Sequence, residues 1–195
     1  MSQLKIGYIA LALCSPMLFA ERAWADRACG GVRLPDKVEA FGKTLQLNGA
    51  GVRRATFLNV HVYVAGLYVP EPTKDVARIL AESQTKELAL HFVRDVSRKE
   101  MMDAIREGID NNAGSKKGAA ESHMQSFERL LPELRAGTRL ILAYDPSRGL
   151  EVREGDKLLG VEKDLDFAQL LFRVWLGAKP PDSKLKAGLL GAKCE

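Results

Sequence analysis

Hydrophobic and polar residues alternate with a period of two in four stretches of the chain, at residues 37–47, 49–69, 88–93 and 140–161. In the second stretch, every other position is apolar in a run of four residues: Leu58, Val60, Val62 and Val64. Successive side chains of a β-strand point to opposite faces of its sheet, so this period is typical of strands with one buried face. We therefore expect a sheet of antiparallel strands joined by short turns.

Turn and capping residues divide these strands. We expect Asn48-Gly49 to form a turn after a first strand pair at residues 37–47. The Pro-Glu-Pro sequence at residues 70–72 should end the next strand, because proline has no backbone N–H to donate to a sheet. Thr73 is then expected to cap a short helix.

Other segments carry the helical period. Residues 97–112 are the clearest case, because Ser97 and Glu100 have the spacing of a capping box at the start of the helix. Its apolar positions recur every three or four residues and should form one buried stripe, made of Met101, Ile105 and Ile109.

Further helices are expected nearer the C-terminus. After a loop at residues 111–120, Ser122 should begin one helix, and residues 167–175 should form another that ends at Gly177. Asp182 should cap a last short helix. Strands followed by helices predict an α+β domain, in which an antiparallel sheet is covered on one side by helices.

The first 25 residues have the pattern of a signal peptide. Lys5 precedes an apolar run at residues 6–20, and Ala23-Trp24-Ala25 places small residues where a signal peptidase inspects them. The run is shorter than the roughly 20 residues that span a bilayer. We expect cleavage before Asp26, a mature domain at residues 26–195, and a periplasmic or secreted protein without a transmembrane segment.

Composition narrows the choice of partners. The chain carries a formal net charge of +4, and its basic residues are mixed with acidic ones along the whole sequence. Because no basic block with interleaved aromatic residues occurs, we expect no nucleic-acid groove. Two cysteines remain after residue 26, Cys29 and Cys194, and in an oxidising compartment they are candidates for a disulfide; the alternative is two free thiols in frayed ends.

No general catalytic pattern is present. The three histidines have no partner three or four residues away, which argues against a metal site: His61, His91 and His123. Gly49 and Gly51 do not make a phosphate-binding loop, because Arg54 stands where a third glycine would be. No serine has glycines two residues away on both sides, so a nucleophile elbow is absent as well. We expect neither a metal nor a cofactor.

Four segments in order carry a resemblance to a known family. They are GAGVR at residues 49–53, VYVAGLYV at 62–69, DVSRKEM at 95–101 and RVWLGAKPPDSKLKAGLLG at 173–191. On these segments the chain resembles the chalcone isomerase-like superfamily, in particular an exported bacterial branch. The resemblance implies an open-faced β-sandwich, in which a large antiparallel sheet carries helices on one face and a ligand cleft lies between them.

The resemblance also places five ligand-contacting positions of plant chalcone isomerases on this chain. The arginine that binds the substrate oxygen matches Arg53. The two threonines, the tyrosine and the asparagine of that active site fall on Tyr63, Val174, Val96 and Asp103. Each oriented donor to a developing oxyanion contributes on the order of 2 to 4 kcal/mol, so losing the tyrosine and both threonines should abolish most of the isomerase rate.

Three interpretations of Arg53 therefore stay open. In the first, a non-catalytic protein binds a small anionic apolar ligand such as a fatty acid, as the fatty-acid-binding branch of the superfamily does, with Arg53 holding the carboxylate. In the second, an isomerase uses Arg53 with Tyr63 as a general acid. In the third, Arg53 pairs with a carboxylate and only stabilises the sheet. The sequence does not indicate the oligomeric state.

Overall fold

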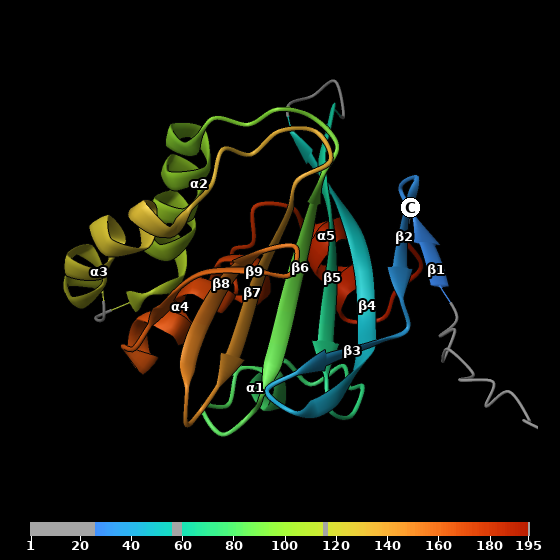
Figure 1. Ribbon diagram of the computed structural model, residues 1–195, viewed down its shortest axis with the longest axis horizontal. Helices are drawn as coiled ribbons and strands as arrows, with labels where there is room; N and C mark the ends of the chain where they lie inside the picture. The colour runs from blue at the N-terminus through green and yellow to red at the C-terminus, as the bar shows by residue number, and fades with distance from the viewer. Residues whose placement is uncertain (1–25, 56–59, 115–116, 195) are drawn as a thin grey trace, which may run out of the picture.

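The computed structural model describes residues 26–55, 60–114 and 117–194 (Figure 1). The predicted signal peptide and Leu58 lie outside these residues. A curled sheet of seven antiparallel strands forms the centre, in the order β3-β4-β5-β6-β7-β8-β9. Its strands are β3 (Lys37–Ala40), β4 (Lys43–Ala55), β5 (Val60–Val69), β6 (Lys86–Phe92), β7 (Arg139–Asp145), β8 (Gly149–Glu154) and β9 (Lys157–Glu162).

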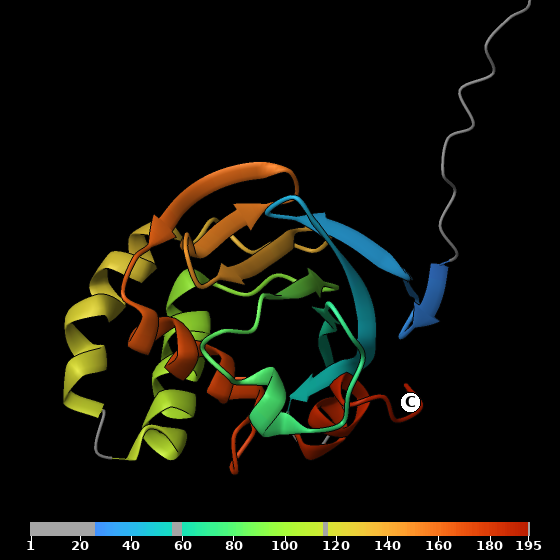
Figure 2. The same ribbon diagram turned by 90° about the horizontal axis from the view of Figure 1, so that it is seen from below.

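Helices cover one face of this sheet. Figure 2 shows the longer helices together on one side of the strands. The helices are α1 (Val76–Ile79), α2 (Arg98–Asn112), α3 (Lys117–Leu130), α4 (Leu165–Leu176) and α5 (Ser183–Leu189). A small hairpin of β1 (Asp26–Cys29) and β2 (Val32–Pro35) packs on the opposite face. The predicted α+β class and the open-faced β-sandwich are confirmed.

Local signals in the sequence correctly located several helix ends. The capping box forms at the start of α2, where the Ser97 side chain accepts from the Glu100 N–H and the Glu100 side chain accepts from the Ser97 N–H. Asp182 caps α5, and the backbone N–H of Gly177 closes α4. These ends were predictable because each depends on residues only a few positions apart.

The predicted turn at Asn48-Gly49 is wrong, because β4 runs through both residues. The buried Asn48 side chain sits at a bulge, where its Nδ2 donates to the Leu189 carbonyl at 2.7 Å and its Oδ1 accepts from the Thr73 N–H at 2.6 Å. A Cβ on Gly49 would lie 2.2 Å from the Gly188 carbonyl oxygen. The dipeptide thus lets α5 approach the strand closely.

Two predicted helix starts are also wrong. Asp75, and not Thr73, caps α1, because its carboxylate accepts from the Ala77 and Arg78 N–H groups. Helix α3 begins at Lys117, five residues before Ser122. The lysines and alanines before Ser122 are good helix formers, and together they outweigh the glycine of this segment.

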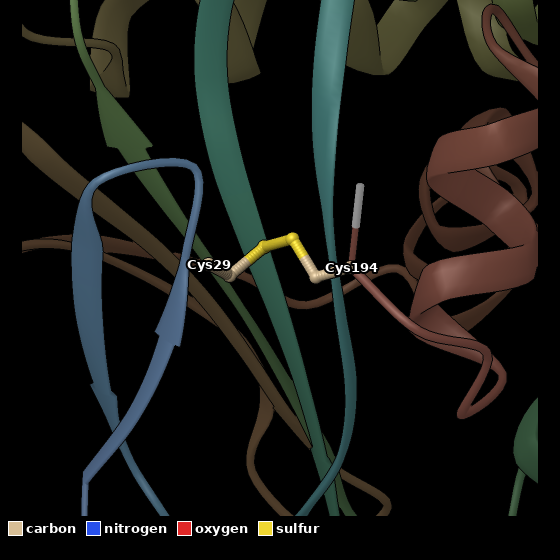
Figure 3. Close-up of a disulfide and its surroundings, with 2 residues drawn as sticks. All are labelled: Cys29 and Cys194. Atoms are coloured by element: carbon tan, nitrogen blue, oxygen red, sulfur yellow. A yellow bond between two sulfur atoms is a disulfide. The ribbon is translucent and has the colours of Figure 1, made fainter.

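The hairpin of β1 and β2 was not predicted from the alternation, but a local signal for it exists. Gly30 and Gly31 both have positive φ, at 52° and 82°, which suits a two-residue hairpin turn. Cys29 ends β1 and forms the predicted disulfide with Cys194, with their Cα atoms 5.6 Å apart (Figure 3). The hairpin and the C-terminal segment are thereby joined beside β4.

Candidate functional site

A cavity of about 190 Å³ lies between the sheet and the helices, at the end of the sheet where β4 and β6 end and β5 begins. This end is the upper one in Figure 1, where the chain passes from β6 into α2. Apolar side chains from the sheet, α2 and α4 form most of the wall, including Val62, Phe92, Val96, Met101, Ile105 and Val174. Such a wall suits a hydrocarbon group.

Arg53 brings a positive charge to this apolar wall. It is half-buried on β4, directly opposite Tyr63 on β5, and its side chain lines the cavity. Its Nη1 donates to the carbonyl oxygen of Arg54. Within residues 26–55, 60–114 and 117–194, no carboxylate lies within ion-pair distance of the Arg53 guanidinium. This placement argues against a purely structural ion pair.

Tyr63 lies beside Arg53 and is almost completely buried, at 6% exposure. Its hydroxyl oxygen accepts a hydrogen bond of 2.9 Å from Nε1 of Trp175. Burial raises the pKa of Tyr63 to about 12, although Trp175 and Arg53 both act to lower that pKa. Tyr63 is therefore protonated at neutral pH. No acceptor for its hydroxyl proton occurs in the described part of the chain, so this proton can be donated to a ligand.

Three further charged residues line the cavity, and all three are exposed to solvent. Glu100 and Asp95 are already occupied, since Glu100 belongs to the capping box and Asp95 accepts from the Ala136 N–H at 2.8 Å. Arg94 is exposed, and no ion pair to it is found among the described residues. These two carboxylates therefore stabilise the fold, while Arg53 and Tyr63 are less exposed polar groups that can contact a ligand in the cavity.

Four of the five ligand-contacting positions taken from the resemblance line this one cavity: Arg53, Tyr63, Val96 and Val174. Asp103 does not. Its side chain is 53% exposed and pairs with Lys99 at 2.6 Å on the outer surface of α2. The helix turns by about 100° per residue, so the side of α2 that carries Glu100, Met101 and Ala104 into the cavity turns Asp103 toward solvent.

Phe92 and Trp175 lie in segments predicted as a strand and a helix from their apolar periodicity, and both line the cavity. Their apolar periodicity predicted burial correctly, since they are 2% and 1% exposed. Periodicity cannot tell a packed core position from the wall of a cavity, because both face inward. The Trp175–Tyr63 hydrogen bond joins residues 112 positions apart and has no local signal.

Two other features of the described residues bear on function. No group of three His, Cys, Asp or Glu side chains in this part of the chain is arranged to hold a metal ion. None of the helices in the same part is both long enough and apolar enough to cross a membrane.

The fold and the cavity define a class of protein, an open-faced β-sandwich with a ligand-sized space between its sheet and helices. The family model described as chalcone isomerase-like matches residues 26–191. The chain belongs to the chalcone isomerase-like family, so the resemblance seen in the sequence is confirmed.

A solved structure shares this fold. It is the crystal structure of a fatty-acid binding protein from Arabidopsis thaliana, with a TM-score of 0.67 and 17% sequence identity. The match covers 82% of this chain and 92% of that chain. No curated protein matches this chain.

Proposed function

We propose that the mature chain is an exported, non-catalytic protein that binds a small anionic apolar ligand, such as a fatty acid, in the cavity. The observation that carries this proposal is the Arg53 guanidinium, which lines an apolar cavity without an ion-pair partner among the described residues. A half-buried charge without a counter-ion is costly, and a ligand carboxylate would supply that counter-ion.

The two ends of such a ligand match different parts of the cavity. A carboxylate can accept hydrogen bonds from Arg53 and from the Tyr63 hydroxyl, and a charge-assisted hydrogen bond contributes about 1.5 to 3 kcal/mol. The carbon chain would then cover the apolar wall, where each buried methylene contributes about 0.8 kcal/mol to the free energy of binding. The fatty-acid binding protein that shares the fold is consistent with a ligand of this kind.

The isomerase alternative has weaker support. Val96 and Val174 line the cavity in place of a tyrosine and a threonine, and Asp103 lies outside it. Tyr63 would have to act as the general acid, but a pKa of about 12 is far above the neutral range in which proton transfer is efficient. The cavity is therefore better suited to holding a ligand than to transferring protons.

The proposal of export is supported by two features. Ala23-Trp24-Ala25 resembles a signal-peptidase site, and the Cys29–Cys194 disulfide is of the kind that persists in oxidising compartments. Sequencing the N-terminus of exported material should find Asp26. Recovery of a soluble protein that retains Met1 would contradict this part of the proposal.

Trp175 offers a direct test of binding. The sequence has two tryptophans, Trp24 and Trp175, so a chain that starts at Asp26 has Trp175 as its single tryptophan. Titration with octanoate should change its fluorescence in a saturable way. The matched control is 1-octanol, which has the same chain without the charge and should bind at least tenfold more weakly. Equal affinities, or turnover of chalcone at the rate of a plant isomerase, would overturn the proposal.

A further inference from the structure

Trp175 contacts the Tyr63 hydroxyl, one of the two polar groups that can hold a carboxylate in the cavity. Its Nε1 donates to the Tyr63 hydroxyl oxygen at 2.9 Å. Because the indole N–H and the hydroxyl proton repel each other, the hydroxyl proton points away from Trp175. No acceptor for that proton occurs within residues 26–55, 60–114 and 117–194. Since Tyr63 lines the cavity, a ligand there is the acceptor available to it.

Packing fixes both rings of this pair. Trp175 on α4 is 1% exposed. Helix α4 lies tightly against α2, because a Cβ placed on Gly108 would lie 2.5 Å from Cγ1 of Val174. The ring of Tyr63 packs on the ring of Phe92, with their centroids 5.4 Å apart. Neither buried ring can turn without displacing its neighbours, so the direction of the Tyr63 hydroxyl is set before a ligand binds.

We propose that Trp175 is a positioning residue of the carboxylate site, whose N–H orients the Tyr63 hydroxyl so that its proton is donated to the ligand. The inference rests on the proposed function, in which Arg53 and Tyr63 hold a carboxylate. Hydrogen bonds in a chain polarise one another, so the bond from Trp175 strengthens the bond from Tyr63 to the ligand. The ligand atom beside Tyr63 must then be an acceptor, which a carboxylate oxygen is and an ammonium group is not.

The simpler role for Trp175 is packing alone. A buried indole N–H needs an acceptor whether or not a ligand binds, and the Tyr63 oxygen supplies one. The two roles differ in one consequence. If Trp175 only packs, its effect on binding does not depend on the Tyr63 hydroxyl, whereas a positioning role disappears when that hydroxyl is removed.

Calorimetric titration with octanoate of Trp175→Phe, Tyr63→Phe and the double variant separates these roles. Trp175→Phe keeps an apolar ring without the N–H and should weaken binding about threefold or more, in the range for residues of one hydrogen-bond network. In the Tyr63→Phe background the same substitution should have no further effect. Equal losses in both backgrounds, or no loss in either, would overturn the positioning role and leave the proposed function intact. Absence of octanoate binding by the unaltered protein would overturn both.

Phe172→Leu is the matched control for the loss of a buried ring. Phe172 lies on the same helix, is also 1% exposed and does not line the cavity. This variant should be less stable than the unaltered protein and should bind octanoate equally well. A loss of affinity as large as in Trp175→Phe would assign both losses to a general loosening of α4 and would overturn the positioning role.

Nuclear magnetic resonance of the unaltered protein gives a test that needs no variant to fold. In a chain that starts at Asp26, Trp175 supplies the single indole N–H resonance. Saturation with octanoate should move this proton downfield, because a hydroxyl that donates to an anion becomes a stronger acceptor. Saturation with 1-octanol, which carries no charge, should move it less. An unmoved resonance, or an equal movement with both ligands, would overturn the inference.

Discussion

Two cationic side chains lie under the helices at opposite ends of the sheet, and their surroundings differ. Lys86 begins β6 near α1 and has no exposed surface. Its Nζ donates to the Ala81 carbonyl at 3.1 Å and to Oε1 of Gln169 at 3.0 Å, and it lies 4.6 Å from the centre of the Tyr144 ring. Arg53 has only the Arg54 carbonyl as a described partner and lines a cavity.

The difference shows that the Lys86 amine is hydrogen-bonded within the fold, whereas the Arg53 guanidinium can bind a ligand. A buried charge is tolerated when hydrogen-bond partners surround it. The chain itself supplies two hydrogen-bond acceptors to Lys86, which offset part of the cost of burying its amine without any ligand. At Arg53 the chain leaves the space for a partner open, and the apolar wall around it selects a ligand that is both anionic and apolar.

Removal of the disulfide should have the greatest effect on stability and no effect on ligand binding. The disulfide lies on the face of the sheet opposite the cavity and closes a loop of 165 residues. The chain-entropy model gives about 5 kcal/mol as an upper value for such a loop. We expect the double substitution Cys29→Ser with Cys194→Ser to lower the free energy of unfolding by up to this amount, measured by urea denaturation, without changing octanoate affinity. A parallel loss of affinity would show that the hairpin supports the cavity.

A pair of alanine substitutions compares the two cations directly. Lys86→Ala should lower the free energy of unfolding by about 3 kcal/mol, because it leaves a cavity and unpaired acceptors in the core. Arg53→Ala should change it by less than about 1 kcal/mol, since the side chain is half-exposed and has few protein partners. Urea denaturation of both variants would measure the difference. Equal losses would contradict the distinction between the two charges.

The burial of Lys86 should make the stability of the protein depend on pH. Burial lowers the pKa of Lys86 from its ordinary value of 10.5 to about 7. Between these values the unfolded chain binds the proton and the folded chain does not, so stability should rise with pH, by up to about 1.4 kcal/mol per pH unit. Below about pH 7 the amine is charged in both states and the whole penalty is present. Lys86→Met should remove the rise, and a rise that persists in this variant would assign it to another group.

The smallest expected effect concerns the start of α2, beside the cavity. Ser97→Ala should lower the free energy of unfolding by about 1 kcal/mol, because it removes the side-chain oxygen of the capping box. Thermal unfolding followed by circular dichroism would measure this loss. An unchanged midpoint would indicate that the capping box contributes nothing to stability.

The sequence predicted the sheet and the helix ends where the signal is local or periodic. The capping box at Ser97 and the alternation in β6 and β7 are such cases. The prediction of a turn at Asn48-Gly49 was wrong, because the role of this dipeptide depends on its contact with α5. That helix lies about 140 residues later in the sequence and is brought to the strand only by the fold. For the same reason the burial of Lys86 was not predicted, since its partner Gln169 lies 83 residues away in the sequence.

The candidate site was predicted from motif resemblance and not from periodicity. The resemblance placed Arg53, Tyr63, Val96 and Val174 in one cleft, and the structure brings them together. It could not show that Asp103 turns outward, because one residue along a helix changes the direction of a side chain by about 100°. Nor could it show the bond between Trp175 and Tyr63, which needs α4 to pack on β5.

Calorimetric titration of Arg53→Ala with octanoate tests whether the Arg53 guanidinium holds the ligand. Loss of the guanidinium should weaken binding at least tenfold, in line with the loss of a charge-assisted hydrogen bond of about 1.5 to 3 kcal/mol. Arg53→Lys keeps the charge and should retain part of the affinity, while Asp103→Ala, outside the cavity, should bind as the unaltered protein does. If Arg53→Ala folds and binds octanoate with unchanged affinity, Arg53 does not hold the ligand and the proposed function is wrong.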